Sequence, residues 1–150
     1  MEIKKVGVVG AGTMGNGIAQ AFSVAGFPVL MSDISAAAAA KGVATVGGSL
    51  DRLIKKEKMT EAEKAEVMAR IATTTDVGDF AGCDLVIEAA TERLDLKLDL
   101  FARLDAAMQP GAILATNTSS ISISRLAAAT RRADAVVGMH FFNPVPMMTL

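Results

Sequence analysis

Short apolar segments rich in β-branched residues alternate along the chain with longer segments whose apolar residues recur every three or four positions. The first pattern is typical of buried strands and the second of helices with one packed face. Strands are predicted at residues 3–9, 27–33, 70–76, 83–90, 112–117 and 134–141. Helices are predicted at residues 13–25, 35–57, from the segment 60–63 onward, 93–108 and 123–130.

Local signals mark several boundaries of these elements. Gly26 stops the first helix, and the sequence TEAE at 60–63 is a capping box that opens a helix. The Pro-Gly pair at 110–111 ends the helix before it, and Pro28 suits the start of a strand. The two glycines at 47–48 offer a place for a kink in the helix predicted at 35–57.

Strand and helix therefore alternate over the whole length. This alternation predicts an α/β fold, with a doubly wound and mostly parallel sheet that carries helices on both faces. No internal repeat or linker interrupts the pattern, and 150 residues correspond to about one domain. We expect residues 1–150 to form a single domain.

Composition narrows the classes of function. The chain is 51% apolar and 21% charged, which is typical of a globular protein. A net charge of −1 without a long basic stretch gives no support to nucleic-acid binding, and no apolar run is long enough to predict a membrane span. The single cysteine, Cys83, excludes an internal disulfide and suits a small buried side chain. We expect a cytoplasmic protein without nucleic-acid or membrane partners.

The sequence GAGTMG follows the first predicted strand and opens the first predicted helix. Gly10, Gly12 and Gly15 occupy the three glycine positions of a dinucleotide-binding turn. The first glycine allows the tight turn, the second lets a pyrophosphate approach the backbone, and the third lets the helix pack near the strand. The helix start directs free N–H groups and a positive dipole end at the phosphates.

An acid at the end of the second predicted strand supports this interpretation. Asp33 follows the glycine turn by about 20 residues, where a carboxylate hydrogen-bonds the adenine ribose and repels a 2′-phosphate. The pattern predicts a Rossmann-type domain that binds NAD rather than NADP. The alternative is a structural turn followed by an aspartate that caps a helix.

His140 is the only histidine of the chain, and it follows the last predicted strand. A lone histidine is more often an ordinary surface or core residue than a catalyst. Its position favours function, because open α/β sheets bind ligands at the carboxyl ends of their strands, and because imidazole titrates near neutral pH.

Four segments together resemble the L-3-hydroxyacyl-CoA dehydrogenase family, with the bacterial 3-hydroxybutyryl-CoA dehydrogenases as the nearest branch. They are VGVVGAGTMGNGIAQ, DLVIEAATE, NTSS and GMHFFNPVPMMTL, and the resemblance covers the whole chain. The blocks NTSS and HFFNP are more specific than the glycine turn. The resemblance implies a reversible, NAD-dependent oxidation of an L-3-hydroxyacyl-CoA, such as 3-hydroxybutyryl-CoA, to the 3-ketoacyl-CoA.

The same resemblance implies roles for individual residues. His140 would be the base that removes the 3-hydroxyl proton, a task that a neutral imidazole suits, and Ser119 would hydrogen-bond the reacting oxygen. The implied cofactor contacts are Gly10, Gly12, Thr13, Met14, Gly15, Asp33, Glu92, Lys97, Asn117 and Asn143. The implied substrate contacts are Ser49, Lys56, Ser119 and Asn143, and no metal ion is expected.

Structural alternatives to these roles stay open at this point. A serine at 119 or 120 suits a helix cap, and Glu92 suits the first turn of a helix. Asn143 precedes a proline and suits a turn, while the lysines within 55–58 suit a solvated face. The methionines near the last residues suit core or interface packing.

The resemblance also implies parts that lie outside the 150 residues. The family pairs its histidine with a glutamate twelve residues later, at position 152, where it would orient the imidazole. A helical C-terminal domain closes the substrate cleft of the family and makes most of a homodimer interface. We therefore expect residues 1–150 to be the NAD-binding half of a two-domain enzyme, with little turnover alone. An NAD-binding module without turnover and a related dehydrogenase of a sugar acid are the alternatives.

Overall fold

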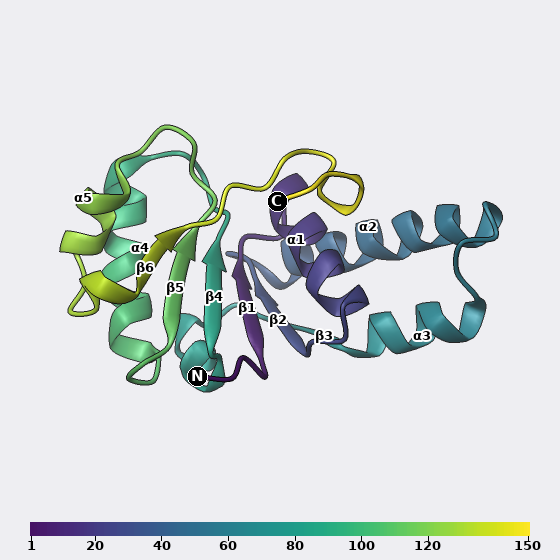
Figure 1. Cartoon of the computed structure of the whole chain (residues 1–150), viewed down its shortest axis with the longest axis horizontal. Helices are drawn as coiled ribbons and strands as arrows, with labels where there is room; N and C mark the ends of the chain where they lie inside the picture. The colour runs from purple at the N-terminus through teal and green to yellow at the C-terminus, as the bar shows by residue number, and fades with distance from the viewer.

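Six parallel strands form one sheet at the centre of the computed structural model, which describes residues 1–150 (Figure 1). The strands are β1 (Val6–Val9), β2 (Val29–Ser32), β3 (Ile71–Thr74), β4 (Leu85–Glu88), β5 (Ile113–Thr116) and β6 (Val136–Gly138). Their order across the sheet is β3-β2-β1-β4-β5-β6. This is the strand order of the Rossmann fold, so the predicted fold class is confirmed.

Helices connect the strands and cover the sheet. They are α1 (Thr13–Val24), α2 (Ala36–Lys55), α3 (Glu61–Ala69), α4 (Leu94–Ala107) and α5 (Ile123–Ala128), with short 3-10 helices η1 (Val77–Gly82), η2 (Ala133–Ala135) and η3 (Val145–Met147). The chain leaves β3 at one edge and returns to β4 beside β1. The order of strands therefore reverses between β1 and β4, which is where such sheets bind ligands.

Every observed strand is shorter than the segment predicted for it. The flanking residues Ile3, Phe27 and Met139 pack against the core but lie outside the strands. Apolar character reports burial rather than pairing in a ladder, so the pattern overestimates strand length. The six-residue η1 was missed, because a short turn with one buried aromatic residue, Phe80, has no helical period.

The core lies on both faces of the sheet, as the alternation of strand side chains requires. Val6 and Val8 of β1 belong to the cluster that α1 covers, whereas Val9 belongs to the cluster that α4 covers. The continuous apolar runs of the strands are thus a consequence of burial on both faces. Cys83 is buried within the second cluster, as predicted.

Helices α2 and α3 form an antiparallel pair that extends away from the sheet beside β3 (Figure 1). Helix α2 continues without a break through residues 47–48, so the glycine pair does not end it. The predicted capping box is present: the hydroxyl of Thr60 accepts from the N–H of Glu63, whose carboxylate accepts from the N–H of Thr60. A small separate core of Val46, Leu50 and Val67 holds the pair together.

The chain after β6 crosses above the carboxyl edge of the sheet and ends beside α1 (Figure 1). This segment packs closely on the helix. The contact leaves no room for a side chain at Gly17, where an added Cβ atom would lie 2.9 Å from the side chain of Val145. None of the helices combines the length and the apolar composition that crossing a membrane requires.

Arg132 caps the carboxyl end of α4 with its guanidinium group. Its Nε donates to the carboxylate of Asp105 at 2.6 Å, and both partners are nearly buried. Its other nitrogens donate to the carbonyl oxygens of Asp105, Met108, Gln109 and Ala112. Burial alone would raise the pKa of the Asp105 carboxyl, but the hydrogen bonds and charges of Arg132 and Arg131 outweigh it and hold that pKa below its usual range.

The substitution Asp105→Asn should lower the free energy of unfolding by about 2 kcal/mol near neutral pH, because it removes a charged hydrogen-bond partner of a nearly buried arginine. A carboxyl whose pKa is depressed by folding stabilises the protein above its unfolded pKa, and this contribution is lost as pH falls through the folded pKa. The difference between the two proteins in urea unfolding should therefore shrink below about pH 4.

The matched control is Asp99→Asn, on the exposed face of the same helix. Asp99 pairs with Arg103 at 3.9 Å in solvent, so this change should leave the urea midpoint nearly unchanged. Equal losses in the two variants would contradict the assignment of Arg132 as a cap that stabilises the fold.

Candidate functional site

The glycine turn between β1 and α1 shows why two of its glycines are needed by the fold itself. Gly10 has φ of 102°, a backbone conformation that other residues rarely adopt. A Cβ atom at Gly15 would overlap the carbonyl oxygen of Gly10, so only glycine lets α1 approach β1 this closely. The physical reasons given for these two positions from the sequence therefore match the geometry.

Gly12 is different, because nothing in the protein requires a glycine there. Its φ is −69°, and an added Cβ atom would meet no protein atom within 4 Å. Gly12 is also the N-cap of α1, and no side chain caps this helix start. The open space and the uncapped N–H groups form a cradle that suits a phosphate group.

Asp33 follows β2 and faces the same turn. One oxygen of its carboxylate accepts from the N–H of Ala11 at 2.9 Å, and the other accepts from the N–H of Ile34 at 2.7 Å. The alternative role as a helix cap is wrong, because Ser35 caps α2 and Gly12 precedes α1. The aspartate is half-buried at the mouth of the turn, where a ribose hydroxyl could reach it.

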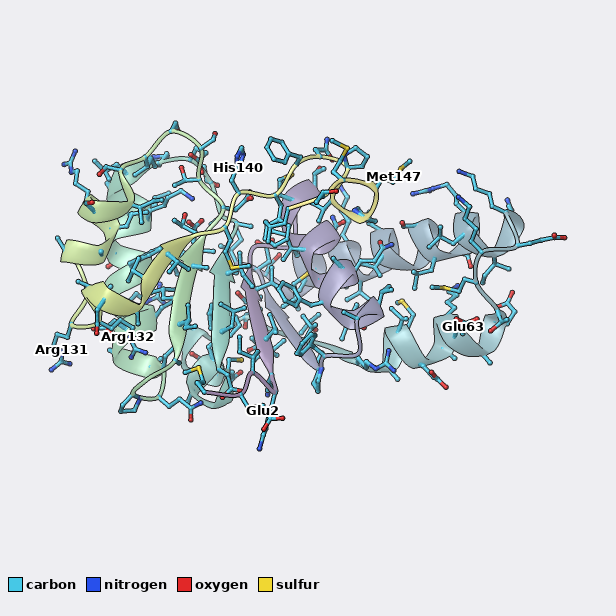
Figure 2. The ribbon with its side chains drawn as sticks, in the orientation of Figure 1. Glu2, Glu63, Arg131, Arg132, His140 and Met147 are labelled. Carbon is cyan, nitrogen blue, oxygen red and sulfur yellow. The ribbon has the colours of Figure 1, made fainter.

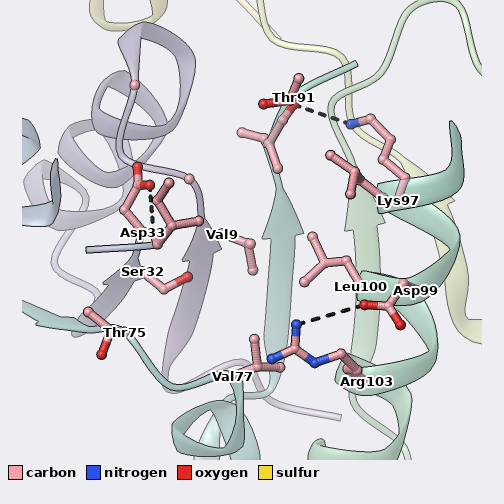
Figure 3. A pocket seen from close by; sticks show the side chains of 16 residues that line it. Val9, Ser32, Asp33, Thr75, Val77, Thr91, Lys97, Asp99, Leu100 and Arg103 are labelled. Carbon is pink, nitrogen blue, oxygen red and sulfur yellow. Dashed lines mark hydrogen bonds and ion pairs between the residues drawn. The ribbon is translucent and has the colours of Figure 1, made fainter. Parts of the chain in front are cut away.

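A pocket of about 580 Å³ opens between the turn and α4 (Figure 3). Asp33 lies on one side of it, and Lys97 and Leu100 of α4 lie on the other. Gly10 and Gly12 also line this pocket. This pocket is at the point where the strand order reverses, between the carboxyl ends of β1 and β4. Its size and its glycine-rich wall fit a nucleotide.

A second pocket of about 290 Å³ lies over the carboxyl ends of β4 and β5. It brings together six of the residues singled out from the sequence: Met14, Glu92, Asn117, Ser119, His140 and Asn143. Figure 2 shows the His140 side chain projecting beyond this edge of the sheet. Residues separated by more than 100 positions thus converge because parallel strands end at one edge.

The backbone beside His140 is held by Asn117. The side-chain oxygen of Asn117 accepts from the N–H of Phe141 at 2.8 Å, and Phe141 is buried beneath the segment. The imidazole itself is exposed and lies 4.8 Å from the ring of Phe142, between ring centroids. The histidine therefore stands on a fixed backbone with both ring nitrogens free for other partners.

Glu92 connects the two pockets through a set of charged hydrogen bonds. Its carboxylate pairs with Lys97 at 3.0 Å and accepts from the hydroxyls of Thr118 at 2.6 Å and Ser120 at 3.0 Å. Burial would raise the pKa of Glu92, but these hydrogen bonds and the charge of Lys97 outweigh it and lower the pKa. Glu92 therefore stays ionised between the pockets.

Two structural alternatives raised from the sequence are wrong. Helix α5 is capped by Ser122, whose hydroxyl accepts from the N–H of Arg125, so neither Ser119 nor Ser120 caps it. Glu92 precedes the N-cap of α4, Arg93, and lies outside the first helical turn. Ser119 is exposed in the second pocket, and its hydroxyl does not cap a helix.

Not every residue singled out from the sequence lines a pocket. Thr13 is exposed at the start of α1, and Gly15 is buried beneath it. Ser49 and Lys56 lie on and just after the second half of α2, apart from both pockets. The structure thus brings the glycine turn and His140 close together, whereas Ser49 and Lys56 lie apart from both.

Glu88 is the charged residue that sequence reasoning missed. It is the last residue of β4, it is completely buried, and it pairs with the equally buried Lys97 at 2.5 Å. An acid at the end of an otherwise apolar strand run was the available signal, because carboxylates are rarely buried without a partner. No group of three His, Cys, Asp or Glu side chains is arranged to hold a metal ion.

Comparison with known proteins identifies the group to which this geometry belongs. Residues 5–150 match the family model described as 3-hydroxyacyl-CoA dehydrogenase, NAD binding domain. The chain belongs to this 3-hydroxyacyl-CoA dehydrogenase family. The predicted cofactor, NAD, is thereby confirmed for this domain, which contains the glycine turn, the open cradle at Gly12 and Asp33.

Individual members of the 3-hydroxyacyl-CoA dehydrogenase family resemble the chain over nearly all of its length. It is 50% identical to a 3-hydroxybutyryl-CoA dehydrogenase of Bradyrhizobium diazoefficiens, covering 99% of this chain and 50% of that protein. The crystal structure of (S)-3-hydroxybutyryl-CoA dehydrogenase from Ralstonia eutropha is 60% identical, with a TM-score of 0.97 over 99% of this chain and 53% of that one. The chain thus spans about half the length of these relatives.

A pair of glycine substitutions tests the cradle. Gly12→Ala should leave the melting temperature nearly unchanged, because its Cβ atom meets no protein atom, and should weaken NADH binding on the order of tenfold by intruding on the pyrophosphate. Binding is measured by the fluorescence of NADH during titration.

The matched variant is Gly15→Ala, which should destabilise the fold first, because its Cβ atom overlaps the backbone of Gly10. Wild-type NADH affinity in a folded Gly12→Ala protein would contradict the placement of the pyrophosphate at this turn.

Proposed function

We propose that this protein interconverts L-3-hydroxyacyl-CoA and 3-ketoacyl-CoA with NAD, with 3-hydroxybutyryl-CoA and acetoacetyl-CoA as the substrate pair. The observation that carries the proposal is the second pocket, where His140, Ser119 and Asn143 surround a space next to the NAD-binding turn. Relatives named 3-hydroxybutyryl-CoA dehydrogenase at 44% to 50% identity support the short acyl chain.

In this proposal His140 moves the proton of the reaction. Oxidation of the substrate carbinol requires that its oxygen lose a proton, and a neutral imidazole near pH 7 is suited to accept it. The exposed imidazole is free to meet an incoming hydroxyl, and the Asn117–Phe141 hydrogen bond fixes the backbone that carries it. Ser119, which lines the same pocket, would hydrogen-bond the reacting oxygen.

NAD supplies the hydride acceptor when it is bound. Gly12 and the start of α1 would hold its pyrophosphate, and Asp33 would hold the adenine ribose. Glu92, Lys97, Asn117 and Asn143 would contact the nicotinamide half of the cofactor, on the side of the second pocket that holds His140.

We further propose that residues 1–150 act with a second, helical domain that supplies the remaining wall of the second pocket and the interface of a homodimer. The relatives, which are about twice as long as this chain, support that organisation. Ser49 and Lys56 would contact the CoA moiety beyond the two pockets, from the protruding α2 (Figure 1).

The substitution His140→Gln in the full-length protein should lower the rate of acetoacetyl-CoA reduction roughly 100- to 10,000-fold, the usual contribution of a positioned acid–base group. Because the exposed imidazole supports no hydrogen bond of the fold, the NADH dissociation constant and the melting temperature should stay close to those of the parent. A variant that retains the parent rate would refute the role of His140 as base.

A pair of lysine substitutions tests the CoA thioester as substrate. Lys56→Ala should raise the Michaelis constant for acetoacetyl-CoA several-fold, because it removes a positive charge offered to the CoA phosphates. Lys58→Ala removes the same charge from a nearby exposed position and should leave the constant unchanged. Unchanged constants in both variants would favour another CoA contact or a substrate without CoA, such as a sugar acid.

A further inference from the structure

Both oxygens of the buried Glu88 carboxylate accept hydrogen bonds. One oxygen accepts from the ammonium group of Lys97 at 2.5 Å and from the N–H of Ala90 at 2.6 Å. The other oxygen accepts from the hydroxyl of Thr116 at 2.8 Å. These contacts join the end of β4, the first turn of α4 and the end of β5 at the point where the strand order reverses.

From Lys97 the contacts continue to both pockets. The ammonium group also pairs with Glu92, which reaches the second pocket, while the Lys97 side chain lines the first. Thr118 and Ser120 lie on the loop that carries Ser119, and their hydroxyl groups both donate to the carboxylate of Glu92. The N–H of Thr118 also donates to the hydroxyl of Thr116. A single chain of hydrogen bonds therefore links the Glu88 carboxylate to the walls of both pockets.

Stability alone is a poor explanation for this buried pair. Removing two charges from water is costly, and replacing a buried ion pair by apolar residues of similar size is often neutral or stabilising. Glu88 and Lys97 are 0% and 1% exposed, so their desolvation is nearly complete. The contacts with Glu88 and Glu92 hold the Lys97 ammonium group in one direction.

We propose that Glu88 is a positioning residue for the cofactor: it holds the Lys97 ammonium group, and through it Glu92 and the Thr118–Ser120 loop, in one arrangement between the two pockets. Glu88 itself is completely buried and lines neither pocket. The inference rests on NAD binding at the first pocket as set out in the proposed function.

The test is a double-mutant cycle read by NADH affinity. In the full-length protein, Glu88→Gln keeps the shape but removes the charge, and it should weaken NADH binding on the order of tenfold, within the range of coupling among side chains of one network. Lys97→Met should weaken binding at least as much. In the Lys97→Met background, Glu88→Gln should cause no further loss of affinity, because its effect acts through Lys97.

Two further variants separate positioning from stability. Asp105→Asn breaks the nearly buried pair at the other end of α4, and it should lower the melting temperature without changing NADH affinity. Thr116→Val removes the hydrogen bond to Glu88 and the acceptor of the Thr118 N–H, two contacts of the same network, while Glu88 keeps its charge, and it should weaken NADH binding about threefold in a folded protein. If Glu88→Gln does not fold, the NADH affinity of Thr116→Val tests the proposal in its place.

Parent-like NADH affinity in folded Glu88→Gln, or in folded Thr116→Val if the former does not fold, would overturn the inference while leaving the proposed function intact. Additive losses in the double variant would likewise overturn it, because they would show that Glu88 acts independently of Lys97. A parent protein that fails to bind NADH would overturn both the inference and the proposed function.

Discussion

The approach of α1 to the end of β1 is the contact on which the rest of the structure depends. Gly15 lies so close to the carbonyl oxygen of Gly10 that no side chain fits between them. This contact places the uncapped start of the helix at the carboxyl edge of the sheet, with Gly12 facing open space. An anion site made from backbone N–H groups follows directly from that packing.

The other walls of the site come from three later connections, which reach the same edge because all six strands are parallel. The loop after β4 contributes Glu92, the loop after β5 contributes Asn117 and Ser119, and the segment after β6 contributes His140. Hydrogen bonds between these loops fix their relative positions before any ligand arrives. Preorganisation of this kind lowers the ordering cost of binding.

The two pockets differ in how completely the chain encloses them. The first has a floor of sheet and walls from the glycine turn and α4. The second is smaller, and exposed side chains line it, among them Phe142. Met148, on the same terminal segment, is also exposed. The family match makes the first pocket part of an NAD-binding domain, and in the proposed function a second domain supplies further walls around His140.

The amino-acid sequence was enough to predict the fold class and the glycine turn with Asp33, and its family resemblance indicated candidate roles for His140 and Ser119. These features depend on local period, on backbone freedom or on short motifs, all of which are carried by neighbouring residues. The limits of the strands were less accurate, because burial and ladder pairing leave the same apolar pattern.

Which polar residues contact one another depends on how the elements pack in three dimensions. The sequence places Glu88 near the end of a predicted strand and Lys97 in a predicted helix, with nothing to indicate a contact between them. Packing of α4 on the sheet buries them as a pair. Ser122, rather than Ser119 or Ser120, proved to be the helix cap, since several neighbouring serines compete for that place and backbone geometry selects one. Pairings across the chain depend on distances in space, which no local pattern contains.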